Sequence, residues 1–222
     1  MCFSAGASFA SGVVISAIGI SSVKEVYKPS QRVFAIIPLL FGIQQLAEGC
    51  LWITLSRTDF VIVKKISTYV FLITAQVLWS WVIPLSVLLM EEEPRRRKIL
   101  RVMLVIGVAL SMYYAFYLFF HKVTSQILDC HILYTTESPE SLALLTFILY
   151  LAVTVASFFV SSIRRMYLLG IIMALSCLMA AVIYKLYLTS VWCFFAAIIS
   201  IFIYLILRES KKSDADINIA GS

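Results

Sequence analysis

Glu48 is the only formally charged residue well inside any of the long apolar stretches of the chain. A charge at the middle of a bilayer costs roughly 2.5–3.5 kcal/mol even on the most lenient insertion scale. An acid kept at that cost typically serves as a metal ligand, a proton carrier or a general base. The structural alternative is a neutral Glu48 hydrogen-bonded to Gln45 or Gln76, since burial disfavours the charged form.

The neighbours of Glu48 form a polar stripe on one side of a predicted helix. The members of this stripe are Phe41, Gln44, Gln45, Glu48 and Trp52. Counted from Phe41, the other four residues follow at three, four, seven and eleven positions, and this spacing places all five on one face. Pro38 can kink this helix, while Gly42 and Gly49 permit a second helix to approach closely. The stripe therefore has to face the interior of a helix bundle.

Thiols, imidazoles and one further acid fall in the segments expected on the same side of the membrane as Glu48. They are Cys2, Cys50, His121, Asp129, Cys130, His131, Cys177 and Cys193. Three chemistries fit this set, the first being a metal site and the second a disulfide from Cys130 to Cys2 or Cys50. The third is redox catalysis, against which the lack of a C-x-x-C motif counts. Small buried thiols are the structural alternative for Cys50, Cys177 and Cys193.

The leading hypothesis is a metal site in which Cys2, Glu48 and His131 hold zinc or copper. Gln45, Gln76, Tyr117 and Tyr134 are the predicted binding residues around it. With Glu48 and Cys2 as catalytic groups, such a site would hydrolyse a lipid or a small amphiphile, because zinc lowers the pKa of bound water. Removal of Met1 would add a terminal amine beside the Cys2 thiol.

Two rival hypotheses come from other function classes. In a transporter or a ligand-binding sensor, Glu48 would be an intramembrane proton or ion site. The absence of an inverted repeat from the sequence counts against transport. The other rival is a structural or assembly protein without chemistry. The last apolar segment has no lysine for a Schiff base, which counts against a retinal protein.

Seven apolar segments are expected to position these groups as transmembrane helices. They span residues 5–23, 33–56, 66–90, 99–120, 141–161, 166–184 and 191–207. Each is near the length needed to cross a hydrocarbon core of about 30 Å. The sequence thus predicts an all-α transmembrane domain over residues 1–207 and a polar, disordered cytoplasmic tail over 208–222. The stretch from 121 to 140 is expected to be the longest loop.

Orientation follows from the distribution of Lys and Arg. The loops after the first, third and fifth segments, together with the tail, hold thirteen of these residues, and the opposite loops hold five. Cytoplasmic loops carry the excess of positive charge. We therefore expect the N-terminus outside, the C-terminus in the cytoplasm and the chain in the inner cell membrane.

Composition agrees with a lipid environment. The 222 residues are 62% hydrophobic and 14% charged, with a mean hydropathy of +0.98. Soluble domains are about 45–50% apolar and about 25% charged. The lipid bilayer is thus the first expected partner, and a lipid or small molecule the second. The net charge of +6 indicates orientation and no nucleic-acid partner, because no soluble segment carries a basic face.

The opening Met1-Cys2-Phe3-Ser4-Ala5 resembles a family of uncharacterised bacterial multi-pass membrane proteins that begin Met-Cys-(Phe or Trp)-Ser-Ala. The likeness continues in the run from Ile37 to Gly49 and in His131-Ile132-Leu133-Tyr134, which looks like a His-x-x-Tyr motif of that family. The resemblance implies a multi-helix membrane protein and supplies no activity. It does single out Cys2, Gln45, Glu48, His131 and Tyr134.

Overall fold

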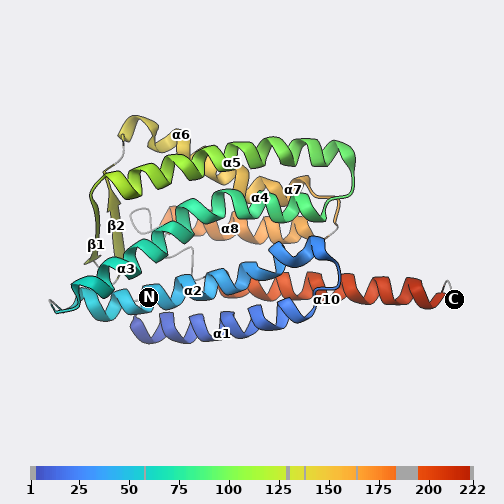
Figure 1. Cartoon of the computed structure of the whole chain (residues 1–222), viewed down its shortest axis with the longest axis horizontal. Helices are drawn as coiled ribbons and strands as arrows, with labels where there is room; N and C mark the ends of the chain where they lie inside the picture. Colours follow the sequence, from blue (N-terminus) through green and yellow to red (C-terminus); the bar gives the residue numbers. More distant parts are fainter. Residues whose placement is uncertain are drawn as a thin grey trace.

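Long helices make up most of the computed structural model (Figure 1), which describes residues 4–57, 59–128, 131–137, 139–163, 165–183 and 195–220. The helices are α1 (Ala5–Lys24), α2 (Arg32–Leu55), α3 (Val61–Leu72), α4 (Trp79–Met90), α5 (Pro94–Phe120), α6 (Glu140–Leu151), α7 (Ser157–Val160), α8 (Met166–Ile183) and α10 (Ala196–Ala220). A short 3-10 segment, η1 (Pro29–Gln31), leads into α2. Ser4 caps α1, since its Oγ accepts a hydrogen bond from the Ala7 amide at 3.3 Å.

Within the described part of the chain, five helical stretches are long and apolar enough to cross a membrane. They are Ala5–Lys24, Pro29–Leu55, Val61–Met90, Pro94–Phe120 and Ser141–Val160. They correspond to the first five predicted segments, so the prediction of a helical, apolar architecture is confirmed. A shorter apolar helix, Met166–Met179, follows in the place of the sixth. The third stretch begins at Val61 rather than 66, so the lysines at 64 and 65 belong to its first turns.

Two of these stretches contain a π-helical turn. The first, η2 (Ile73–Leu78), joins α3 to α4, and the second, η3 (Ala152–Ala156), joins α6 to α7. The Tyr150 hydroxyl, just before η3, donates a hydrogen bond to the carbonyl oxygen of Ala75 in η2 at 2.7 Å. The two wide turns are therefore tied to each other across the bundle.

The segment predicted to be the longest loop contains a β-hairpin. Strands β1 (Val123–Leu128) and β2 (His131–Thr136) pair antiparallel, from Val123 opposite Thr136 to Leu128 opposite His131. The connection over 121–140 thus contains two strands, which the all-α prediction did not include. β-Branched residues recur along both strands, and that composition favours paired strands.

The two ends of the bundle differ (Figure 1). One end holds the hairpin, the start of α1 and the end of α2, and the other holds the turn between α4 and α5. The C-terminal helix α10 passes this second end and continues to Ala220. The backbone is thus helical in a segment predicted to be disordered. Contacts near the start of this predicted tail explain the difference, because Ser210 hydrogen-bonds Tyr27 at 3.0 Å and Lys211 pairs with Glu25 at 3.2 Å.

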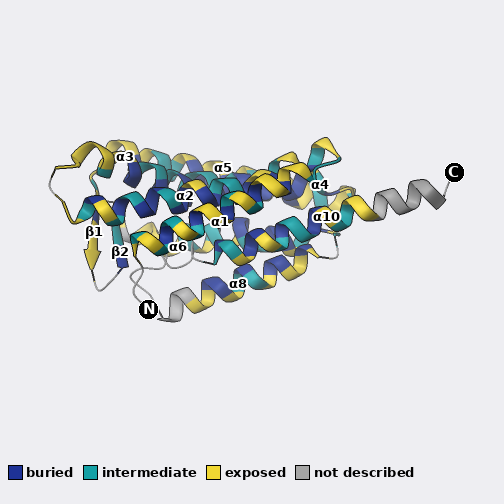
Figure 2. Cartoon of the chain, turned by 90° about the horizontal axis from the view of Figure 1, so that it is seen from below, coloured by how far each residue is buried: buried dark blue, intermediate teal, exposed yellow. Residues whose placement is uncertain are grey.

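Burial separates a central pair of stretches from a peripheral set (Figure 2). The most apolar window of α2 and that of the stretch from α3 to α4 are each 61% buried, against 22% for α5. The outward faces of the peripheral helices carry exposed apolar side chains, among them Val13, Val105, Met112 and Leu144. Soluble proteins rarely expose so much contiguous apolar surface, so these faces fit contact with lipid.

Candidate functional site around Glu48

Close packing of α1 against α2 sets the position of Glu48. Glycines on both helices allow this contact, because a methyl group added at any of them would collide with the facing residue. The facing pairs are Phe9 with Gly49, Gly12 with Leu46, Ser16 with Gly42, and Gly19 with Leu39. The register is antiparallel and unbroken over these turns. It places Glu48 opposite the first turns of α1.

The polar stripe predicted from the sequence is buried, as its spacing required. Glu48 is 3% exposed, Gln44 0% and Gln45 2%. Phe41 extends the stripe and stacks on Trp79 of α4, with ring centroids 4.3 Å apart. Three polar side chains on successive positions of one helix face are thus removed from solvent. Each needs partners inside the protein, because an unsatisfied buried polar group costs about 1–3 kcal/mol.

Both glutamine amides have partners on other helices. The Trp79 indole N–H donates to Gln44 Oε1 at 3.0 Å, and the Ser11 hydroxyl donates to Gln45 Oε1 at 3.3 Å. An indole N–H can only donate, so the bond from Trp79 fixes which end of the Gln44 amide is the carbonyl. The Gln44 NH₂ group is therefore a donor, four residues before Glu48 on the same face.

Trp52, one helical turn beyond Glu48, contributes a second donor. Its Nε1 atom is shielded from solvent and has no hydrogen-bond partner among the described residues. Such orphaned donors are rare in native structures, and an unplaced water or ligand is a common explanation. Sequence reasoning placed Trp52 on the correct face but did not identify this role. Only the packing of side chains around the indole could identify it.

The hairpin brings His131 and Tyr134 to the same half of the bundle. His131 is 7% exposed, and the Tyr134 ring stacks on Phe71 of α3 at 4.5 Å with an angle of 7°. Ile132, between them, packs in a hydrophobic cluster with Ala47 and other residues of α2 and α3. The two residues of the His-x-x-Tyr sequence therefore belong to the end of the bundle that holds Glu48.

Other predicted residues lie elsewhere or outside the described ranges. Tyr117, on α5, has ring contacts with His121 and Tyr113, each at 4.8 Å. Gln76 is half-buried in η2, where its carbonyl accepts a bond from Ser80 Oγ at 2.6 Å. The predictions that fall outside the described ranges concern Cys2, Asp129, Cys130 and Cys193.

The remaining thiols are free in the structure. Cys50 is half-buried and Cys177 is buried. A disulfide from Cys130 to Cys50 is therefore not formed, whereas a pairing of Cys130 with Cys2 concerns two residues outside the described ranges. Among the residues that the structure describes, no three His, Cys, Asp or Glu side chains come together as a metal site. The predicted trio of Cys2, Glu48 and His131 thus depends on Cys2.

Comparison with known proteins gives a family and no activity. No curated protein and no solved structure matches the chain. The match to a family covers residues 1–218, which is nearly the whole length. The chain therefore belongs to DUF6629, a family of unknown function.

Proposed function

We propose that this protein is a metal-binding membrane protein, with a transition metal held beside Glu48 in one half of a seven-helix bundle. In this proposal the first five membrane stretches are joined by α8 and α10, the N-terminus is outside, and the C-terminus is cytoplasmic in the inner cell membrane. The distribution of Lys and Arg supports this orientation. The apolar outer faces of the helices support the lipid environment.

One observation carries the proposal. The carboxyl group of Glu48 is almost fully buried in α2, while the Gln44 amide one turn away is oriented as a donor by Trp79. A buried acid has to be paired or to coordinate a metal, so a bound cation suits this position. The orphaned indole N–H of Trp52 supports a ligand oxygen or a water next to that cation.

The proposed ligands are the Glu48 carboxylate, the His131 imidazole and the Cys2 thiolate. Thiolate and imidazole select zinc or copper over magnesium or calcium. Gln44 and Gln45 would orient the carboxylate, as residues hydrogen-bonded to metal ligands generally do. Zinc bound there would supply a water of lowered pKa, which fits hydrolysis of a lipid or a small amphiphile.

Metal analysis tests the proposal directly. The full-length protein, purified in mild detergent without chelators, is analysed by elemental mass spectrometry beside Glu48→Gln. Glu91→Gln is a matched control, because Glu91 is also fully buried but lies between α4 and α5, at the opposite end of the bundle. We expect near-stoichiometric zinc or copper in the wild type and in Glu91→Gln, and loss of most of the metal in Glu48→Gln. Wild-type protein without metal would refute the proposal.

A proton or ligand site at Glu48 is the second candidate. It is favoured by one observation, that Glu48 is the one titratable residue on the described buried face of α2. A transporter or sensor of this kind would lose its pH dependence in Glu48→Gln. A metal-dependent hydrolase would instead retain ligand binding in that variant and lose turnover. Ligand binding measured across pH in both proteins separates the two.

A further inference from the structure

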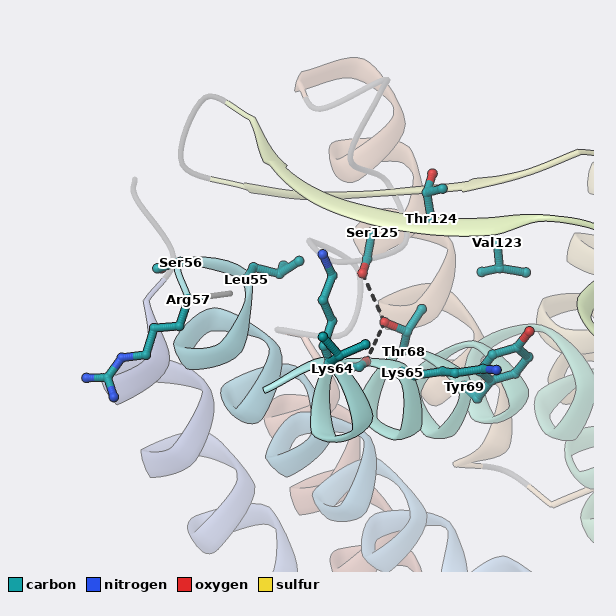
Figure 3. A pocket seen from close by; sticks show the side chains of 11 residues that line it. Leu55, Ser56, Arg57, Lys64, Lys65, Thr68, Tyr69, Val123, Thr124 and Ser125 are labelled. Atoms are coloured by element: carbon teal, nitrogen blue, oxygen red, sulfur yellow. Dashed lines mark hydrogen bonds between the residues drawn. The ribbon is translucent and has the colours of Figure 1, made fainter. Parts of the chain in front are cut away.

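A cavity of about 520 Å³ lies between the hairpin and the start of α3 (Figure 3). Its wall includes Leu55 at the end of α2, Arg57 just after it, Lys64 and Lys65 on α3, and Ser125 on β1. The Thr68 hydroxyl hydrogen-bonds the Ser125 hydroxyl at 2.9 Å, and both residues are buried. This bond joins the hairpin to α3 at the floor of the cavity. The cavity is therefore built from two elements that the sequence separates by more than fifty residues.

The charge of the cavity wall is positive. Arg57, Lys64 and Lys65 all contribute to it, and the acid in the same connection is Asp59. In Figure 3 the Lys64 side chain points towards Ser125, whereas Arg57 is directed away from the hairpin and Lys65 extends along α3 towards Tyr69. One ammonium group thus lies inside the cavity, whereas Arg57 and Lys65 contribute to its wall with their charged ends directed away from its centre. Hydroxyl groups and cations together are the usual ligands of a phosphate group.

Two further features strengthen the attraction for an anion. Val61, the first residue of α3, lines the cavity, and the backbone N–H groups at a helix start attract negative charge. Of the four Lys and Arg residues that the structure describes at this end of the bundle, three line this one cavity, namely Arg57, Lys64 and Lys65.

The surroundings of the cavity are apolar and exposed. Val61 is 68% exposed, Ile62 75% and Ile66 57%, all on the first turns of a membrane stretch. A free phosphate ion would gain nothing from these side chains. The acyl chains of a phospholipid would cover them while its headgroup reached the cations.

We propose that this cavity binds the phosphate group of an anionic phospholipid, with Lys64 inside and with Arg57 and Lys65 in the wall. The acyl chains lie along the exposed side chains of Val61, Ile62 and Ile66. The site is separate from Glu48 and does not depend on the metal-binding proposal. It supplies a specific position for lipid on a face of the protein that has no other assigned role.

Binding of short-chain lipids to the full-length protein in mild detergent tests this site. The probes are dihexanoyl phosphatidylglycerol, dihexanoyl phosphatidylcholine and inorganic phosphate, and the dissociation constant of each is measured by calorimetry. We expect the wild-type protein to bind the anionic lipid at least tenfold more tightly than the zwitterionic lipid. We also expect it to bind phosphate more weakly than the anionic lipid. Equal affinity for the two lipids would overturn the proposal, and equal affinity for phosphate would make the ligand a free phosphate ion.

Charge variants locate the site. The double variant Lys64→Gln with Lys65→Gln should lose about 10- to 30-fold in affinity for the anionic lipid, since each surface cation contributes roughly one factor of five. Lys64→Arg with Lys65→Arg should restore binding. Lys98→Gln with Arg101→Gln removes the same charge from exposed positions on α5 at the other end of the bundle. An equal loss of affinity in this control would overturn the assignment. The comparison of the two lipids on the wild-type protein remains a test even if a variant fails to fold.

Discussion

The hydroxyl of Tyr150 donates a hydrogen bond to the carbonyl oxygen of Ala75 at 2.7 Å, across seventy-five residues of sequence. Ala75 lies in the π turn η2, and Tyr150 stands just before the π turn η3. A π turn widens the helix and disturbs the regular bonding of its carbonyl groups. In lipid such a group needs another donor, because no water is present to supply one. Tyr150 meets this need at η2.

Tyr150→Phe is therefore expected to lower the free energy of unfolding by about 0.5–1.5 kcal/mol, the usual contribution of one hydrogen bond. The ring is retained, so the packing changes little. Thermal unfolding in detergent, followed by circular dichroism, measures the effect. Tyr204→Phe on α10 is the control, since Tyr204 is also half-buried and its hydroxyl makes no such bond to a described residue. Equal melting temperatures for the two variants would contradict a structural role for the Tyr150 bond.

Much of the helical architecture could be predicted from apolar runs and periodicity. The stripe containing Gln44, Gln45 and Glu48 is buried because polar residues three and four positions apart have to share a face. The π turns could not be predicted. The residues of η2 continue the apolar run of α3 and α4, and nothing in their composition separates a wide turn from a regular one.

The hairpin and the cavity beneath it were missed for a related reason. Residues 123–136 are too short and too polar to count as a membrane segment, so they were assigned to a loop. Without β1, no partner for Thr68 could be foreseen, and Lys64 and Lys65 appeared as ordinary loop charges. Long-range pairing, which periodicity does not encode, brings these residues together.

The hydrogen bonds of Glu91 should make the free energy of unfolding fall at acidic pH. Its fully buried carboxylate accepts hydrogen bonds from the Ser162 amide and hydroxyl, both at 2.6 Å, and from the amide of Glu93 at 3.0 Å. Burial alone would raise the pKa of Glu91, but the bonds from Ser162, Glu93 and Ser161 together lower it below the ordinary value. The group binds protons more weakly in the folded state than in the unfolded state. Its contribution is therefore present above the ordinary glutamate pKa of about 4.3 and is lost as the pH falls through the lowered value.

Melting temperatures recorded between pH 3 and pH 7 test this prediction. The wild-type curve should fall on the acid side, and Glu91→Gln should flatten that fall. At neutral pH the same variant should lose about 1–3 kcal/mol, because one of the donors around the carboxylate is left without an acceptor. Parallel acid limbs in the two proteins would show that other groups control the transition.

Gly107 fixes the approach of α5 to α4. A Cβ atom built at this position would overlap the backbone carbonyl of Ser80, which cannot rotate away as a side chain can. Gly107→Ala should therefore force the helices apart and cost about 1–3 kcal/mol in unfolding free energy. Gly6→Ala is the matched control, because the nearest atom to its Cβ would be Ser4 Oγ at 3.9 Å. That change should be neutral or slightly stabilising, since alanine favours helix over glycine. Comparable losses in both variants would contradict close packing at Gly107.

Substitution of Trp52 is expected to affect the stability of the fold and the binding of metal in different ways. The Trp52 indole N–H is buried and has no hydrogen-bond partner in the part of the chain that the structure describes, one turn from Glu48. Trp52→Phe removes this donor and keeps an aromatic ring, and the free energy of unfolding should stay constant or rise by up to about 1 kcal/mol. An oxygen of a ligand or of metal-bound water can accept a hydrogen bond from this N–H. In that case Trp52→Phe should bind metal about tenfold more weakly, because removing a residue that is hydrogen-bonded to a metal ligand typically costs that much affinity. Thermal unfolding and zinc titration on one preparation measure both quantities. A stabilised variant with unchanged zinc affinity would place the ligand away from Trp52, whereas a destabilised variant would show that the indole N–H has a partner in the folded protein.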